Sequence, residues 1–256
     1  MKRIITFLFV AIAMTFSACS KVDKENFPDQ DGRYYTFALG KPETKSILGN
    51  DANGKFGQWE QGDCIGTAID DNAPGYAYIT TSTTPVTFSI YKKGGLTKGM
   101  KVYTYYPFNS AASSATSIPF SIPVAQSQSG STFDFDAMPM VGVPFEVPEE
   151  YVSTETNTEI GEIQLLNLGS LVDFQVYSSN TEYAGETILN VKFSANKAIA
   201  GSFTKSITSV NNDESTLTIS GYTETDVTTT VDNPAAIGAN RSAASHVYME
   251  IGRAHV

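Results

Sequence analysis

Histidine and cysteine most often carry acid–base or nucleophilic chemistry near neutral pH, and this 256-residue chain contains two of each. A Ser-His-Asp triad would have to use His246, because His255 lies in a terminal segment discussed below, and no Gly-x-Ser-x-Gly elbow precedes His246. The cysteines and histidines do not supply a four-ligand zinc site or a disulfide framework. We therefore expect no catalytic residue, no metal site and no cofactor, in a protein that is not an enzyme.

Carboxylates are the remaining candidates for chemistry, since the chain has 27 acidic and 17 basic residues and a formal net charge of −10. Counting does not exclude a glycosidase pair, but most of these carboxylates lie in turn-like or linker-like segments, where solvation explains them. Asp51-Ala52-Asn53-Gly54 opens like a calcium-binding loop, yet the twelfth position of that loop would be Gly62 instead of a bidentate Glu. The acidic surface also repels phosphate backbones, so we expect no nucleic-acid partner.

The N-terminus predicts export and a lipid anchor. Two basic residues precede an apolar run over residues 4–14, which suits a signal peptide and is too short to span a bilayer. Ser17-Ala18-Cys19 follows and resembles the lipobox at which bacterial lipoprotein signal peptidase cuts. We predict a signal peptide over residues 1–18, a lipid on Cys19 and a polar tether over residues 19–33. The alternative is ordinary cleavage after small residues, with Cys19 incidental.

The C-terminus predicts a segment that is not part of the natural protein. The last seven residues, 250–256, read Glu-Ile-Gly-Arg-Ala-His-Val. A widely used sequencing-library adapter encodes this sequence when a gene prediction reads into it, so we interpret these residues as an adapter-derived tail. The alternative is the genuine end of a strand that begins with the alternating residues 245–249.

The body of the chain predicts an all-β sandwich fold, because short β-branched and aromatic runs are separated by Gly, Pro, Asn and Asp. We expect two successive β-sandwich domains, over residues 34–157 and 158–249, the second incomplete. Trp59 and Ile65 are expected to face a core from a hairpin that turns at Gly62-Asp63. The expected strands are 34–39, 56–59, 64–69, 76–80, 86–91, 101–106, 117–122, 138–143, 163–166, 171–177, 188–193, 199–203, 216–219 and 227–231.

Several segments together are similar to the fimbrillin family of Bacteroidetes, in particular to the Mfa-like fimbrillin lipoproteins. The segments that carry this resemblance are Trp59-Glu60-Gln61-Gly62-Asp63-Cys64-Ile65-Gly66, Tyr103-Thr104-Tyr105-Tyr106-Pro107-Phe108, Ile122-Pro123-Val124-Ala125-Gln126-Ser127-Gln128, Phe133-Asp134-Phe135-Asp136-Ala137-Met138-Pro139-Met140 and Leu166-Asn167-Leu168-Gly169-Ser170-Leu171-Val172-Asp173-Phe174.

The resemblance implies transthyretin-like β-sandwich domains and a structural role as a stalk, tip or anchor subunit of an adhesive pilus. It implies an outer-membrane, cell-surface or fimbrial location, with the lipid on Cys19 in the membrane. The implied partners are other pilus subunits, joined by donor-strand exchange, and host or bacterial surface glycans or proteins.

The resemblance also implies proteolytic processing. In polymerising members of the family, a trypsin-like protease removes the lipidated segment together with the first strand, here residues 34–39. Lys45 occupies the place where that cut would fall, whereas Lys41 is followed by Pro42 and is a poor site. The alternative is that Lys45 is a solvated loop lysine in an uncleaved lipoprotein.

A glycan-binding surface lipoprotein is the alternative function. The tyrosines Tyr76, Tyr78, Tyr103 and Tyr105 have side chains that can stack on sugar rings. Core and cross-strand packing is the competing explanation, because strands are enriched in Tyr.

Overall fold

The structure is a computed structural model and describes residues 32–40, 47–51, 54–59, 61–70, 72–83, 85–129, 132–133, 138–148, 158–183, 185–234 and 236–253. The protein is all-β, as the sequence predicts. The only helical turns in these ranges are the 3-10 segments η2 (Thr181–Tyr183), η3 (Glu214–Leu217) and η4 (Arg241–Ala243). None of the helical segments described is long and apolar enough to cross a membrane.

One large sheet of nine strands dominates the fold. Its order is β13 (Thr158–Ile163), β1 (Gly32–Leu39), β6 (Val86–Lys93), β5 (Gly75–Thr81), β4 (Cys64–Ile69), β7 (Lys101–Tyr106), β11 (Met140–Gly142) and β14 (Leu165–Asn167), with β12 (Phe145–Glu146) beside β7. Within this sheet β1 and β13 are parallel, and the other pairs are antiparallel. Only Gln164 separates β13 from β14, so the first and last strands of the sheet are consecutive in the chain.

The large sheet curls around one apolar cluster, which we call the inner core. Buried side chains from the whole length of the strand order meet in it: Tyr35, Phe37, Leu39, Trp59, Ile65, Ile69, Ala77, Ile79, Phe88, Ile90, Leu96, Val102, Tyr106, Met140, Val147, Ile160, Ile163 and Leu165. Trp59 and Ile65 both belong to it, which confirms that they face a core. The expected hairpin between their strands is wrong, because β3 (Gly54–Gln58) pairs with β2 (Ile47–Asp51) while β4 pairs with β5 and β7.

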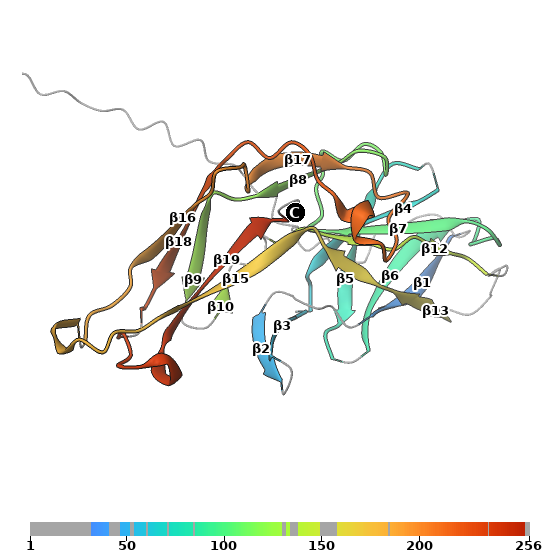
Figure 1. Cartoon of the computed structure of the whole chain (residues 1–256). Coiled ribbons are helices and arrows are strands. Elements are labelled where there is room, and N and C mark those ends of the chain that lie inside the picture. The colour runs from blue at the N-terminus through green and yellow to red at the C-terminus, as the bar shows by residue number, and fades with distance from the viewer. Residues whose placement is uncertain are drawn as a thin grey trace, which may run out of the picture.

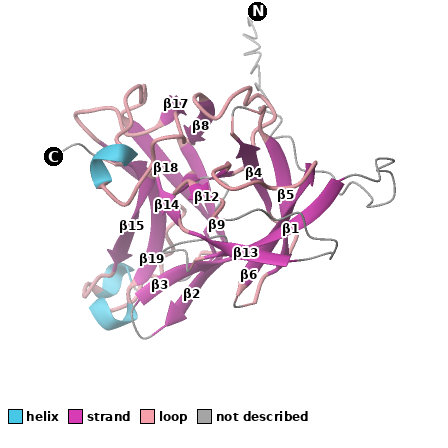
Figure 2. Ribbon diagram, turned by 90° about the vertical axis from the view of Figure 1, so that its right-hand side faces the viewer, coloured by secondary structure: helices cyan, strands magenta, loops and turns pink. Residues whose placement is uncertain are grey.

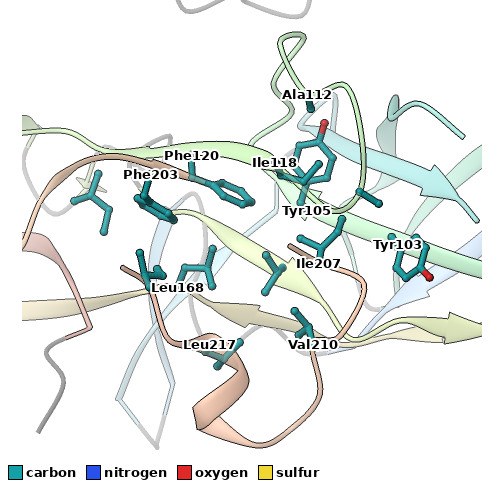
Figure 3. Packing of buried hydrophobic residues seen from close by; sticks show 14 of the residues in the cluster. Tyr103, Tyr105, Ala112, Ile118, Phe120, Leu168, Phe203, Ile207, Val210 and Leu217 are labelled. Atoms are coloured by element: carbon teal, nitrogen blue, oxygen red, sulfur yellow. The ribbon is translucent and has the colours of Figure 1, made fainter. Parts of the chain in front are cut away.

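A second apolar cluster, the outer core, covers the opposite face of β4 and β7. It contains Tyr103 and Tyr105 from β7, apolar residues of the antiparallel pair β8 (Ile118–Ile122) and β17 (Gly201–Lys205), and apolar residues of the 207–219 segment. Phe120 and Phe203 stack with ring centroids 5.6 Å apart, and the Tyr105 ring meets Phe120 edge-on at 6.0 Å. Figure 3 shows these rings side by side.

The remaining strands form a second group at the other side of the molecule (Figure 1). Its four-stranded sheet has the order β10 (Thr132–Phe133), β9 (Ala125–Ser129), β18 (Asp226–Asp232) and β16 (Asn190–Ser194). A two-stranded antiparallel ribbon, β15 (Gly169–Val176) with β19 (Ser245–Gly252), lies next to it, and β19 contacts β9 and β18.

Most of the expected strands are present with shifted ends, and three differences concern the run 216–219, β9 and the end of β19. The run 216–219 is wrong, because Asp213 caps the 3-10 turn η3 there by accepting from the backbone N–H of Ser215. β9 was not expected, because its sequence is polar. The strand that begins at Ser245 continues to Gly252. Glu250 and Ile251, which belong to the segment interpreted above as an adapter-derived tail, therefore pair with β15.

Residues on both sides of position 157 contribute to the sheets and to the cores. β13 and β14 complete the large sheet, and the outer core combines Val141 with Leu168 and Val227. The division into two domains at residues 157 and 158 stays a prediction.

The packing of Tyr105 on Gly66 generates a stability prediction. A Cβ added at Gly66 would lie 2.0 Å from Cζ of the buried Tyr105 ring, whereas a Cβ added at Gly75 on the neighbouring strand meets nothing within 4 Å. We expect Gly66→Ala to lower the free energy of unfolding by about 1–3 kcal/mol through overpacking. Gly75→Ala is the matched control and should change it by no more than about 1 kcal/mol. Urea unfolding of both variants measures this, and equal effects would contradict it.

Candidate functional site

The two site residues predicted from the sequence, Cys19 and Lys45, lie outside the described residues. The lipid on Cys19 and the cut at Lys45 therefore stay predictions. What the structure does describe is the strand that such a cut would release, β1, and the surface tyrosines of the alternative function.

Strand β1 lies in the large sheet between β6 and β13 (Figure 2), and we call its place between them the strand slot. On one side β1 pairs antiparallel with β6 along its whole length, from Gly32 opposite Lys93 to Leu39 opposite Val86. On the other side it pairs in parallel with β13, from Tyr35 opposite Thr158 to Leu39 opposite Ile163. β1 is therefore held by two ladders, and its removal would leave two unpaired strand edges facing one another.

The side chains of β1 fill apolar pockets of the inner core. Tyr35, Phe37 and Leu39 are all buried, and Phe37 is fully enclosed. The Phe37 ring stacks on Phe88 at a centroid distance of 5.5 Å and meets Phe145 edge-on at 5.5 Å. The residues of β1 that enter the inner core are two apart, which is the period of a strand, so β1 is both a sheet member and a core segment. An extended peptide with apolar residues at alternate positions has the chemistry to occupy the same space.

The four tyrosines that suggest sugar binding divide into two classes. Tyr103 and Tyr105 are buried in the outer core, so core packing explains them and the sugar-stacking hypothesis is wrong for this pair. Tyr76 is 43% exposed and Tyr78 is half-buried on β5. Only the second pair can meet a ligand from solvent.

Tyr76 and Tyr78 belong to a small aromatic cluster at the surface. The ring centroids of Tyr76 and Tyr78 are 5.5 Å apart, and Phe108 lies 5.4 Å from Tyr76. Phe108 is the second residue after β7 and donates its backbone N–H to the carbonyl of Cys64 at the start of β4, which places it beside β5. We call Tyr76, Tyr78 and Phe108 the aromatic cluster. Sequence reasoning identified the tyrosines but missed Phe108, because the contact depends on the path of the chain after β7.

His246, the histidine considered above for a catalytic triad, is paired with a carboxylate. His246 on β19 lies with Nδ1 2.8 Å and 3.0 Å from the two carboxylate oxygens of Asp173 on β15. The imidazole also stacks on the Tyr248 ring at 6.1 Å. Among the described residues no hydroxyl or thiol is hydrogen-bonded to Nε2 of His246. His246 and Asp173 therefore form a side-chain pair that joins the neighbouring strands β19 and β15. The non-enzymatic character of the protein stays a prediction.

Comparison with known proteins shows a similar fold in a solved structure of low sequence identity. No protein-family model and no curated protein matches the chain. Among solved structures, a candidate cell adhesion protein from Bacteroides uniformis is similar to it, with a TM-score of 0.53 and 13% sequence identity over 88% of this chain and 76% of that chain. At this identity the likeness establishes the all-β fold.

The burial of Tyr105 predicts a change of stability at alkaline pH. Burial raises the pKa of its hydroxyl, which donates to the carbonyl of Asn109 at 3.4 Å, from 10.0 to about 12. A raised folded-state pKa means that the contribution to stability is complete below about pH 10, the unfolded value, and is lost as the pH rises towards 12. We expect the wild type to lose at most about 2–3 kcal/mol more than Tyr105→Phe across this window.

Denaturant unfolding between pH 9 and pH 12 measures the difference between the two proteins. Tyr222 serves as an internal reference, because burial and the nearby Glu250 raise the pKa of its hydroxyl in both proteins. Identical pH profiles for wild type and Tyr105→Phe would contradict the assignment.

Proposed function

We propose that this protein is a fimbrillin-like, lipid-anchored surface protein, a structural subunit that joins its neighbours by strand exchange in an adhesive fibre. The observation that carries the proposal is the strand slot, since β1 pairs on both edges and fills pockets of the inner core. The sequence motifs that resemble the fimbrillin family and the fold shared with a candidate cell adhesion protein of Bacteroides uniformis support it.

The physical logic of exchange follows from the slot. Loss of β1 would expose the unpaired backbone groups of β6 and β13 together with the pockets of Phe37 and Tyr35. A strand from a second subunit, running antiparallel to β6 and parallel to β13, would restore both ladders and bury its own apolar side chains. While β1 stays covalently attached it competes at very high effective concentration, so the precursor is a monomer in this proposal.

Cleavage after Lys45 is the proposed trigger and gives the test of the function. We expect a trypsin-like protease to convert the purified lipidated precursor into a product that begins at Ser46 and forms oligomers. The released fragment should carry the fatty-acid label, which Cys19→Ala should not acquire. N-terminal sequencing and size-exclusion chromatography report both steps.

Lys45→Ala is the control, because it removes the trypsin site that would release β1 and leaves the strand slot intact. It should give no product that begins at Ser46 and should stay monomeric under the same treatment. A wild-type product that begins at Ser46 and remains monomeric would overturn strand exchange, and a precursor that is never cut there would overturn the processing step.

A second candidate function is glycan binding, favoured by the exposed aromatic cluster. Tyr76 presents an exposed ring with a hydroxyl at its edge, and such rings stack on the apolar faces of sugars. In this proposal Tyr76, Tyr78 and Phe108 contact the sugar, and Tyr103 and Tyr105 support the sheet beneath them. The adhesive role and the glycan ligand are compatible, because the residues of the aromatic cluster lie outside β1.

Tyr76→Ala tests the second candidate. We expect it to reduce retention on a polysaccharide affinity gel by about tenfold. This is the effect of losing one stacked ring, if its stacking free energy is about 1.4 kcal/mol. Tyr34→Ala is the matched control, since Tyr34 is 39% exposed on β1 and pairs with Tyr91 instead of the cluster. Equal retention of wild type and Tyr76→Ala on every gel, or equal loss in Tyr34→Ala, would contradict a sugar site at the aromatic cluster.

A further inference from the structure

Strand β9 turns two glutamines into the protein interior. Its sequence is Ala125-Gln126-Ser127-Gln128-Ser129, and the exposed fractions of Gln126 and Gln128 are 3% and 2%. Residues two apart in a strand point to the same face, so both amides leave β9 in one direction. Buried positions of this kind are usually apolar, and a buried amide is costly unless its hydrogen bonds are made.

Both amides bond to the backbone of β19. The Gln126 Oε1 accepts from the N–H of Glu250 at 2.8 Å, and its Nε2 donates to the carbonyl of Glu250 at 2.8 Å and to that of Pro123 at 3.0 Å. The Gln128 Oε1 accepts from the N–H of Tyr248 at 2.8 Å, and its Nε2 donates to the carbonyl of His246 at 2.9 Å.

These bonds lie on the edge of β19 that faces away from β15. β15 pairs with β19 along its whole length, from Gly169 opposite Gly252 to Val176 opposite Ser245. Alternate residues of a strand direct their backbone groups to opposite edges, so the groups of residues 246, 248 and 250 that meet the glutamines are those a third strand would bond. A primary amide presents a carbonyl and an N–H as a peptide group does, which lets it take that place.

We propose that Gln126 and Gln128 act as a substitute strand. Their amides bond to the edge of β19 that faces away from β15 and so fix the register of β19. A slip of β19 by one residue would turn these backbone groups away from the amides and leave buried donors and acceptors without partners. Glutamate would lose the N–H donor, and asparagine is one methylene shorter, so the chemistry selects glutamine at both positions.

The proposed role does not depend on the side chains of β19. The hydrogen bonds described above join the amides to backbone atoms of β19, in His246, Tyr248 and Glu250, so they fix the register whatever residue occupies position 250. It also gives a physical role to the Ile122–Gln128 segment, which sequence reasoning used only as a mark of resemblance. Gln126 and Gln128 are thus positioning residues for β19, independent of strand exchange at β1.

Amide hydrogen exchange followed by NMR tests the proposal residue by residue. Gln128→Met removes the acceptor for Tyr248 and should speed exchange of the Tyr248 N–H by roughly ten- to hundredfold relative to that of Glu250. Gln126→Met should give the reverse selectivity. Methionine is close to glutamine in length and volume, and Ser127→Ala, on the exposed face of the same strand, is the control that should change neither amide.

Two results would overturn the proposal. One is equal acceleration of both amides in either variant, which would indicate general loosening. The other is unchanged protection of Tyr248 in Gln128→Met and of Glu250 in Gln126→Met. If the variants do not fold, the wild type still decides, because its Gln126 and Gln128 side-chain N–H protons must then exchange slowly with water, and fast exchange would refute the assignment.

Discussion

The fold depends on β4 and β7 being buried on both faces. Ile65 and Val102 face the inner core, whereas Tyr105 faces the outer core and lies against Gly66. Strands buried on both faces have almost continuous apolar sequences, and both strands are of this kind. Only a glycine at position 66 lets the Tyr105 ring approach the neighbouring strand so closely. The large sheet thereby separates the two cores at β4 and β7. The strand slot lies within this sheet, the aromatic cluster lies beside β5, and β8 and β17 pack on the face of the outer core.

The sequence was most informative where burial and strand period agree. Cys64–Ile69 and Lys101–Tyr106 were predicted with the bounds that the structure has, because their apolar runs end at turn residues. The run 216–219 alternates like a strand, but a side-chain cap at Asp213 stabilises a 3-10 turn instead. β9 was missed for the opposite reason, since it is a strand whose inward residues are polar.

The sequence was less informative about which strands and side chains meet. The pairing of β1 with β13 joins residues more than a hundred positions apart, and no local pattern specifies such a pair. The exposure of a side chain is equally hard to predict from the sequence. Tyr76 and Tyr105 are both strand tyrosines, yet Tyr76 lies at the surface and Tyr105 lies beneath β8 and β17. The position of a side chain relative to the second layer decides its role, and that position is a property of the topology.

The double pairing of β1 has a mechanical consequence. A pull on the chain at Gly32, directed along the strand, loads the ladders to β6 and β13 in parallel, because both run beside β1 over most of its length. Bonds loaded in parallel must break together, whereas a strand peeled from an edge loses them one at a time. The pockets of Phe37 and Leu39 resist the same sliding motion, since each side chain would have to leave its place at once. A pull along the chain therefore meets β1 in shear, with both ladders and the core pockets opposing it at the same time.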